Sequence, residues 1–430
     1  MRIGVLFALC WAGATVAADD LDATLAALVD LPTPKERAAQ ARELAKNKDR
    51  TLDMWLAATR RFAPKAEPPP KTGSVSAVAA LPTGRVDVQL SVPARYRHDR
   101  PTPLLLALHG TGGDGTNETA RWRSIADDLG FIVCAPTDSG ANKGYTFMPG
   151  ERAEALAVLR WVRRRYNIDE NRIHLTGVSR GGHLTWDLGT RQPDRWASLA
   201  PMIGGPRLDL SRGQNNLRYL ENIAHLPIRD LQGEGDDKRL LFNLRYAFAL
   251  LQKHGARDAE LVTFPALGHS FRFEAVAWPT FLGTTRRDPV PSRVVRLTAR
   301  ASEGRAYWVE IRQTKRPVKE VFVPQVRADE WARLDDAGKR RFMAEAALAR
   351  TARLEVEMTG PGEFNAKSTG VARFRLLLTT AMFDPRTAVS LRWQGRARSK
   401  RVRLSTRVLL SEFAERFDRT FLPVGELSIP

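Results

Sequence analysis

Short apolar runs alternate with longer segments of three- and four-residue periodicity between about residues 86 and 285. Several runs are apolar at nearly every position, which is typical of strands in a sheet covered on both faces. Helical periodicity is clearest in the stretches that begin at Glu151 and Lys238. The alternation predicts an α/β domain over residues 86–285 with a mostly parallel sheet. Its expected strands are Val86–Val92, Leu104–Leu108, Phe131–Ala135, Ile173–Thr176, Leu199–Ile203, Ile228–Gln232 and Glu260–Phe264.

The regions on either side of this domain follow other patterns. Residues 19–63 have helical periodicity and predict a helical N-terminal segment, and the proline-rich residues 64–85 predict a linker. Residues 292–430 predict a separate β-rich C-terminal domain with one helix at about 328–349 and a hairpin turn at Gln394-Gly395. The strands expected there are 294–300, 306–313, 320–326, 373–379, 388–394 and 400–405.

Residues 1–18, MRIGVLFALCWAGATVAA, have the pattern of a secretory signal peptide. A basic residue, an apolar run and a small-residue exit follow one another in the expected order. We expect a cleaved, secreted or periplasmic protein in which Cys134 is the remaining cysteine, so that no intramolecular disulfide forms. No other apolar run approaches the ~20 residues needed to span a bilayer, and no transmembrane segment is expected.

Composition and charge limit the classes of partner. The hydrophobic fraction of 43% is enough for a folded core, which excludes disorder of the whole chain. The formal net charge is +19, and from residue 286 onward 30 Lys and Arg face 17 Asp and Glu. Because no zinc-finger or RNA-binding signature accompanies this excess, we expect no specific nucleic-acid binding. Weak association with anionic surfaces through the C-terminal domain is expected instead.

The glycine-rich stretch at residues 177–181 carries the first candidate chemistry. Gly177-x-Ser179-x-Gly181 follows an apolar strand and precedes a helix, which is the context of a nucleophile elbow. A serine on such a sharp turn projects its hydroxyl above the sheet, and side chains in place of the glycines would collide with backbone. Alone the motif is weak, because glycine and serine are common in loops. Ser179 is therefore a candidate nucleophile that needs support from elsewhere in the chain.

A second glycine-rich turn follows the second expected strand of this domain. The sequence His109-Gly-Thr-Gly-Gly can bring a backbone N–H group to a developing oxyanion. We expect the N–H of Thr111 or Gly112 to act there, with the N–H of Arg180 as the other donor. His109 is expected to brace the loop by hydrogen bonding rather than to transfer protons.

Two later strands are followed by an acid and a histidine. Glu234, Asp236 and Asp237 come after one strand, and Asp236 is preferred over Asp237 as the carboxylate that orients a histidine. His269 follows the next strand, and an imidazole can take and return a proton near neutral pH. The chain order Ser179, Asp236, His269 is the order of an α/β-hydrolase triad.

Residues from about Pro103 to Leu282 resemble the α/β-hydrolase superfamily. They are most similar to its secreted esterases related to polyhydroxybutyrate depolymerases, feruloyl esterases and dienelactone hydrolases, with the prolyl-oligopeptidase catalytic domain as a cousin. Besides the motifs above, the stretch YNIDENRIHLTGVSRGGHLTWDLGTRQPDRWASLAPMIGG carries the similarity. In it an Asp-x-x-Arg turn leads into the serine strand and a Pro-Asp pair follows the helix. Residues 292–430 resemble, more faintly, the β-rich tail of some secreted bacterial esterase-like proteins.

The resemblance implies an α/β-hydrolase core and a two-step acyl transfer on an ester substrate, small or polymer-linked, without a cofactor. Ser179 would attack the carbonyl, His269 would accept its proton, and Asp236 would hold the imidazole. Two alternatives remain open at this point. One is a serine peptidase related to prolyl oligopeptidase, and the other is a non-catalytic secreted protein that binds a polymer or surface.

Other polar and aromatic residues favour structural roles. The histidines outside the motifs are scattered without ligand spacing, so no metal site is expected. His183 is expected to pack near the serine, and Trp186 and Trp278 are expected in the core. The scattered histidines are His98, His174, His225 and His254.

Overall fold

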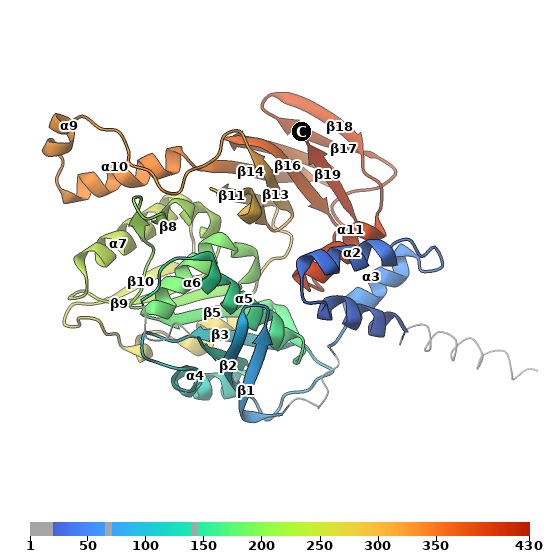
Figure 1. Ribbon diagram of the computed structural model, residues 1–430, viewed down its shortest axis with the longest axis horizontal. Helices are drawn as coiled ribbons and strands as arrows, with labels where there is room; N and C mark the ends of the chain where they lie inside the picture. Colours follow the sequence, from blue (N-terminus) through green and yellow to red (C-terminus); the bar gives the residue numbers. More distant parts are fainter. Residues whose placement is uncertain (1–19, 65–70, 139–143) are drawn as a thin grey trace, which may run out of the picture.

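The computed structural model describes residues 20–64, 71–138 and 144–430 (Figure 1). The expected signal peptide and part of the expected linker lie outside these residues. Among the helices of the described ranges, none combines the length and apolar character that crossing a membrane requires.

An eight-stranded sheet forms the centre of the molecule. Its strand order is β1-β2-β4-β3-β5-β6-β9-β10, with antiparallel pairing from β1 through β2 to β4 and parallel pairing from β4 to β10. All seven strands expected from the apolar runs are present, and the prediction of an α/β core is confirmed. The strands are β1 (Gly73–Leu81), β2 (Gly84–Val92), β3 (Thr102–Leu108), β4 (Ile132–Thr137), β5 (Ile168–Val178), β6 (Ser198–Met202), β9 (Ile228–Gly233) and β10 (Ala259–Phe264).

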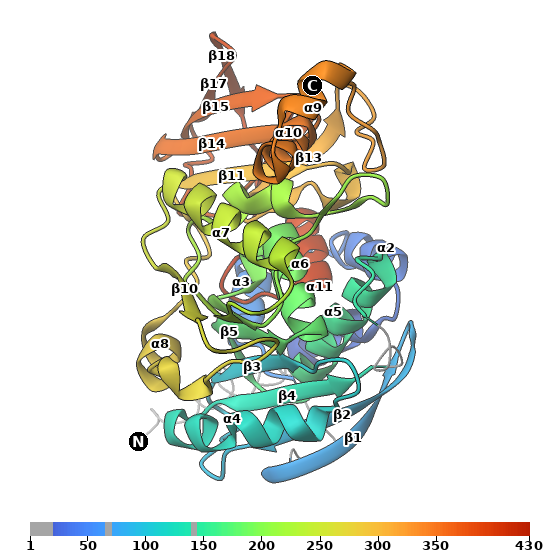
Figure 2. The ribbon, with the colours of Figure 1, turned by 90° about the vertical axis from the view of Figure 1, so that its left-hand side faces the viewer.

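Helices cover both faces of this sheet (Figure 2). On β3, Leu104 and Leu106 belong to the core beneath α5, α6 and α7, whereas Leu105 belongs to the core beneath α4 and α8. Strands buried on both sides are mostly apolar, which explains the nearly continuous runs. Trp186 and Trp278 lie in these cores, as expected. The helices are α4 (Gly115–Leu129), α5 (Pro149–Arg163), α6 (Arg180–Arg191), α7 (Lys238–Lys253) and α8 (Trp278–Thr284).

The expected linker over residues 64–85 is wrong for its second half. Strand β1 occupies residues 73–81 and pairs with β2 along its whole length, from Gly73 opposite Val92 to Leu81 opposite Gly84. Its sequence, GSVSAVAAL, is rich in small residues with weak strand preference, and a proline run precedes it. Pairing with β2, rather than local preference, therefore determines this edge strand.

Two further sheets build the C-terminal domain. The five-stranded sheet has the order β11-β14-β15-β17-β18 and the four-stranded sheet β12-β13-β16-β19, and both contribute to one hydrophobic core. The turn Gln394-Gly395 joins β17 to β18 with φ of 51° and 76°, which confirms the expected hairpin. The strands are β11 (Arg293–Thr298), β12 (Arg305–Ala306), β13 (Val309–Thr314), β14 (Ala352–Gly360), β15 (Glu363–Thr369), β16 (Val371–Leu378), β17 (Ala388–Trp393), β18 (Arg396–Arg401) and β19 (Gly425–Ile429).

Several sequence expectations for this domain are wrong, among them the strand expected at 400–405, which lies at 396–401. Residues 320–326 form no strand, and Pro324 within that run cannot donate to a ladder. The hairpin of β14 and β15 was not expected, although its buried positions alternate. The single expected helix is two helices, because Asp335 accepts a hydrogen bond from Gly338 N–H and caps a new start, and a third helix follows near the C-terminus. The helices are α9 (Ala328–Arg333), α10 (Asp336–Ala349) and α11 (Thr406–Arg416).

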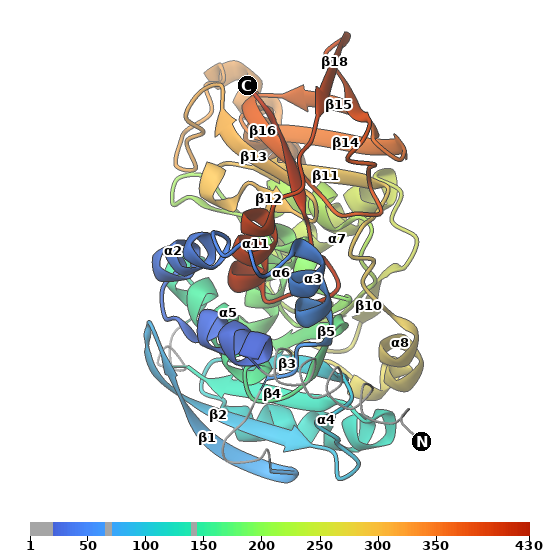
Figure 3. The same cartoon turned by 90° about the vertical axis from the view of Figure 1, so that its right-hand side faces the viewer.

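The helical N-terminal segment packs with the C-terminal domain and not as a unit of its own (Figure 3). It comprises residues 20–30, α2 (Pro34–Leu44) and α3 (Leu52–Arg61). The rings of Phe62, Phe413 and Phe417 meet edge to face with centroids 5.6–5.8 Å apart.

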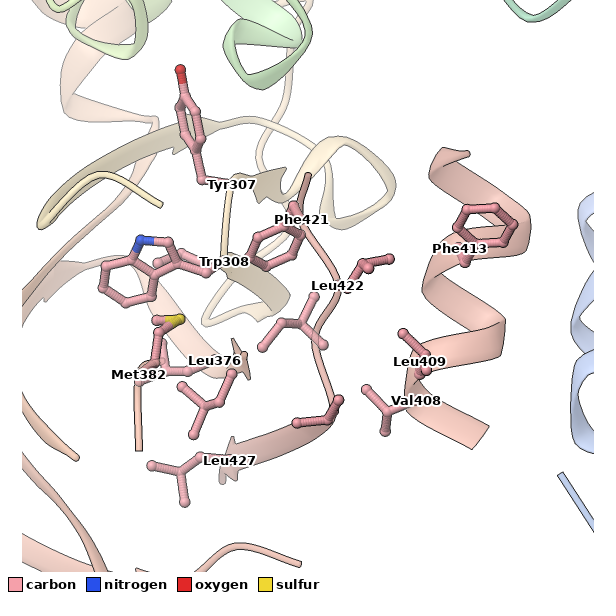
Figure 4. Packing of buried hydrophobic residues seen from close by; sticks show 14 of the residues in the cluster. Tyr307, Trp308, Leu376, Met382, Val408, Leu409, Phe413, Phe421, Leu422 and Leu427 are labelled. Carbon is pink, nitrogen blue, oxygen red and sulfur yellow. The ribbon is translucent and has the colours of Figure 1, made fainter. Parts of the chain in front are cut away.

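The hydrophobic core of this joint unit extends from the strands to α11. Figure 4 shows Leu376 and Leu427 of the four-stranded sheet in one cluster with Leu409 and Phe413 of α11. The same cluster includes apolar residues of the N-terminal helices. The two ends of the described chain therefore share one core beside the central sheet domain.

The remaining elements are short. They are β7 (Leu208–Asp209), β8 (Gln214–Asn215) and the 3-10 helices η1 (Pro193–Arg195), η2 (Leu217–Ile223), η3 (Phe273–Ala275) and η4 (Ala301–Glu303).

A buried ion-pair cluster joins the central sheet domain to the C-terminal domain. Asp187 of α6 is inaccessible to solvent and accepts hydrogen bonds from Tyr145 (2.7 Å), Arg152 (2.9 Å) and Arg191 (2.8 Å). Both arginines also contact Glu303 of the C-terminal domain. Burial alone would raise the pKa of the Asp187 carboxyl, but Arg191 and Arg152 outweigh it and lower this pKa below its ordinary value.

Replacing Asp187 with alanine should destabilise the protein strongly. The change leaves two buried guanidinium groups without the more deeply buried of the two carboxylates that they share, and we expect a loss of about 3–5 kcal/mol at pH 7. The free energy of unfolding from urea titrations measures it. Because the pKa of Asp187 is lowered in the folded state, the difference from wild type should shrink as the pH falls below about 4. The exposed Asp329→Ala is the control, with a loss of about 0.5 kcal/mol or less.

Candidate active site

Ser179 lies on a strained turn between β5 and α6. Its backbone has φ 53° and ψ −109°, a conformation that non-glycine residues rarely adopt. A Cβ on Gly177 would come within 2.4 Å of the Gly181 backbone, and one on Gly181 within 2.1 Å of the Leu108 carbonyl oxygen. The two glycines are therefore required by the close approach of β3, β5 and α6 around the serine.

The three side chains singled out in the sequence form one hydrogen-bonded row. Ser179 Oγ lies 2.9 Å from His269 Nε2, and His269 Nδ1 lies 2.7 Å from Asp236 Oδ2. All three follow the carboxyl ends of parallel strands, β5, β9 and β10, which meet at one edge of the sheet. The His269 side chain is 53% exposed, so a substrate and water can reach it. In this arrangement an imidazole can take the serine proton while a carboxylate orients the ring.

Asp236 is held in place by its neighbours. Gln232 Nε2 donates a hydrogen bond to Asp236 Oδ2 at 2.8 Å, and the N–H of Asp237 donates to Oδ1 at 2.7 Å. Partial burial by itself raises the pKa of Asp236, but the hydrogen bonds from His269, Asp237 and Gln232 lower it below its ordinary value. The carboxylate therefore stays charged at neutral pH. Sequence reasoning missed Gln232, a buried polar residue near the end of β9.

The two alternative acids, Asp237 and Glu234, make other contacts. Asp237 accepts a hydrogen bond from the N–H of Arg239 at 2.7 Å and caps α7. Glu234 lies 3.5 Å from Arg245 near the surface. The structure thus brings Asp236, and neither of its neighbours, to His269.

The loop after β3 runs beside the serine. A Cβ on Gly110 would lie 3.4 Å from the Ser179 Cβ, and Gly113 N–H closes the turn by donating to the Gly110 carbonyl at 3.0 Å. Thr111 and Gly112 stand at the tip of this turn, and Gly112 has φ 75°. The backbone of this loop and the first turn of α6 therefore flank the Ser179 side chain.

His109 braces that loop, as expected. Its Nδ1 lies 2.7 Å from the Gly110 carbonyl oxygen, and its Nε2 accepts a hydrogen bond from Asp138 N–H at 3.3 Å. Both ring nitrogens are thereby engaged by backbone, and the ring is buried.

The side chain of Arg180, whose role the sequence left open, also contacts Asp138. Its guanidinium is buried, pairs with the Asp138 carboxylate and lies 3.5 Å from Glu151. This pair ties the first turn of α6 to the segment after β4. Asp138 was not expected at the site, because no motif marks it.

The other histidines lie outside the Ser179–His269–Asp236 row. His183 packs beside it, with Nδ1 2.7 Å from the Gly205 carbonyl and its ring near Phe147. Burial lowers the pKa of His174 to about 3 and that of His225 to about 4. Within the residues that the structure describes, no three His, Cys, Asp or Glu side chains gather as a metal site requires.

Comparison with known proteins gives no matching family model but several curated relatives. A bifunctional acetylxylan esterase/xylanase of Neocallimastix patriciarum is 29% identical over 160 residues, 35% of this chain and 21% of its own. Poly(3-hydroxyalkanoate) depolymerase C of Paucimonas lemoignei is 32% identical over 116 residues, 24% of this chain and 28% of its own. A probable feruloyl esterase C of Aspergillus oryzae is 26% identical over 140 residues, 30% of this chain and 51% of its own.

The chain thus spans from about a fifth to half of the length of these relatives. Each is named for an esterase or depolymerase activity, and each matches only part of this chain. The central sheet has the topology of an α/β-hydrolase fold, and the matched segments are similar to parts of esterases and depolymerases.

Proposed function

We propose that this protein is a serine hydrolase that cleaves carboxylic esters. The hydrogen-bonded row of Ser179, His269 and Asp236 is the observation that carries the proposal. The strained turn at Ser179 supports it, because strain of this kind persists where it positions a reacting group.

The reaction proceeds in two steps. Ser179 Oγ attacks the ester carbonyl while His269 Nε2 takes the hydroxyl proton, and His269 returns that proton to the departing alcohol. The backbone N–H groups of Thr111 or Gly112 and of Arg180 stabilise the tetrahedral oxyanion. A water molecule then gives a proton to His269 and attacks the acyl group on Ser179, and His269 returns that proton to Ser179 Oγ as the acid is released.

Ester cleavage is preferred over the two alternatives. The three relatives are named as an acetylxylan esterase, a polyhydroxyalkanoate depolymerase and a feruloyl esterase. Hydrolysis of an ester bond is the chemistry that these names share. A serine peptidase would use the same row and would differ in hydrolysing peptide p-nitroanilides. A purely binding protein would not require the ordered contacts of His269 and Asp236. Residues 1–18 favour export of the protein to the periplasm or medium.

We also propose that the hairpin of β17 and β18 associates weakly with anionic surfaces. Its exposed cations have no acidic neighbour in sequence between Asp384 and Glu412, and none forms an ion pair with the described residues. Such an edge attracts polyanions in a salt-dependent manner. These cations are Arg392, Arg396, Lys400 and Arg401.

Replacing the nucleophile should abolish ester turnover. We expect Ser179→Ala to lower kcat for p-nitrophenyl acetate by about 10⁴-fold or more, because the acyl-enzyme cannot form. Initial rates of wild type and variant measure it, and circular dichroism checks the fold. Equal rates for the two proteins, or no turnover by wild type with any short acyl chain, would contradict the proposal.

The two adjacent acids should behave differently. Asp236→Asn keeps the shape but removes the charge that orients His269, and we expect kcat to fall about 10⁴-fold. Asp237→Asn retains a good helix cap and should leave kcat within about twofold of wild type. Kinetics with the same ester compare them. A similar loss of kcat in both variants would contradict the proposed role of Asp236.

Neutralising the hairpin should weaken retention on a polyanion. We expect the triple change Arg396→Gln, Lys400→Gln and Arg401→Gln to elute from a heparin column at lower salt than wild type. The control replaces the exposed Lys315, Arg316 and Lys319 in the same way, which changes the net charge equally. Elution of both variants at one salt concentration would show that net charge, and not the hairpin, governs retention.

A further inference from the structure

A cavity of about 290 Å³ lies directly beside the candidate catalytic row. His269 and Asp236 form part of its wall, and Leu208 and Leu240 give it an apolar side. A group seated there lies next to the imidazole that would take the Ser179 proton. The cavity is therefore placed to hold the part of a substrate that adjoins the reacting ester.

Three arginines from separate parts of the chain line the same cavity. Arg207 comes from the loop after β6, Arg239 from the first turn of α7, and Arg340 from α10 of the C-terminal domain. Figures 1 and 2 show α10 lying over the edge of the central domain at α7. The tertiary fold, and no local motif, brings these cations together.

None of the three guanidinium groups has a carboxylate partner within 4.0 Å among the described residues, in contrast to the arginines of the interior. The acids of the cavity are engaged elsewhere. Asp236 binds His269, and Asp237 caps α7. Asp209 accepts from Ser211 Oγ at 2.8 Å and from Arg212 N–H at 3.1 Å.

Two of the guanidinium groups are positioned by aromatic rings. Arg207 stands 5.8 Å from the centroid of Phe147, and Arg340 stands 5.5 Å from that of Phe242. Stacking of this kind holds the planar group while leaving its N–H edge available. A guanidinium edge matches a carboxylate in shape and charge, and forms paired hydrogen bonds with it.

We propose that this cavity binds a carboxylate of the substrate, so that the preferred substrates are esters carrying a free carboxylate close to the scissile bond. The inference rests on the proposed ester hydrolysis and names its substrate class. Monoesters of dicarboxylic acids and acyl groups on acidic sugars have this chemistry. In this arrangement Arg340 makes the C-terminal domain a contributor to substrate selection.

Matched pairs of esters test the preference. The first pair is 4-acetoxybenzoate and 4-acetoxybenzamide, with the charge on the alcohol side. The second is monomethyl glutarate and methyl 4-carbamoylbutanoate, with the charge on the acyl side. We expect KM to be about tenfold lower for the charged member of one pair, and Arg340→Gln to reduce that ratio toward one. The neighbouring Arg341→Gln, exposed on the same helix, should keep it.

Binding to the Ser179→Ala protein separates this inference from the proposed reaction. Calorimetry with the same four esters should again favour the charged member of one pair, and added NaCl should weaken only that binding. Equal affinity for both members of both pairs would overturn the carboxylate site. Preferential binding of a charged ester without hydrolysis by wild type would support the site and contradict the esterase proposal instead.

Discussion

The candidate site depends on backbone segments that approach one another too closely for any side chain. A Cβ on Gly181 would meet the Leu108 carbonyl at 2.1 Å, and one on Gly233 would meet the Gly268 carbonyl at 1.9 Å. The first contact fixes the serine turn against the end of β3. The second fixes the end of β9 against the loop of His269. Together they determine where the hydroxyl, imidazole and carboxylate lie, so the geometry of the row follows from steric constraint on the backbone.

Much of the central domain and of the row could be predicted from the sequence, for a physical reason. Strands buried on both faces leave continuous apolar runs, and the residues after them gather at one edge of a parallel sheet. Ser179, Asp236 and His269 were therefore identifiable from their order and position. The strand at residues 73–81 was not, because its small residues carry little preference and its pairing with β2 decides its structure.

Residues that reach the site through tertiary structure gave no sequence signal. Gln232 orients Asp236, and Asp138 neutralises Arg180, yet neither stands in a recognisable motif. Arg340 lines the cavity from the C-terminal domain, which follows the central sheet domain in the sequence. The buried cluster around Asp187 shows that the two domains are in fact packed against each other. Glu303 of the C-terminal domain pairs with Arg152 and Arg191 of the central domain. Separating the domains would leave buried charges without their partners, which costs free energy.

The contact between the two ends of the described chain has a consequence for how the protein is made. Arg419 donates a hydrogen bond to the carbonyl of Phe62 at 2.9 Å, across 357 residues of sequence. The apolar face of the N-terminal helices is thus covered by α11, a segment far along the chain, and this contact can form only after that segment has been made. A chain interrupted before residue 406 leaves that face uncovered, and an uncovered apolar helix is what chaperones and proteases recognise.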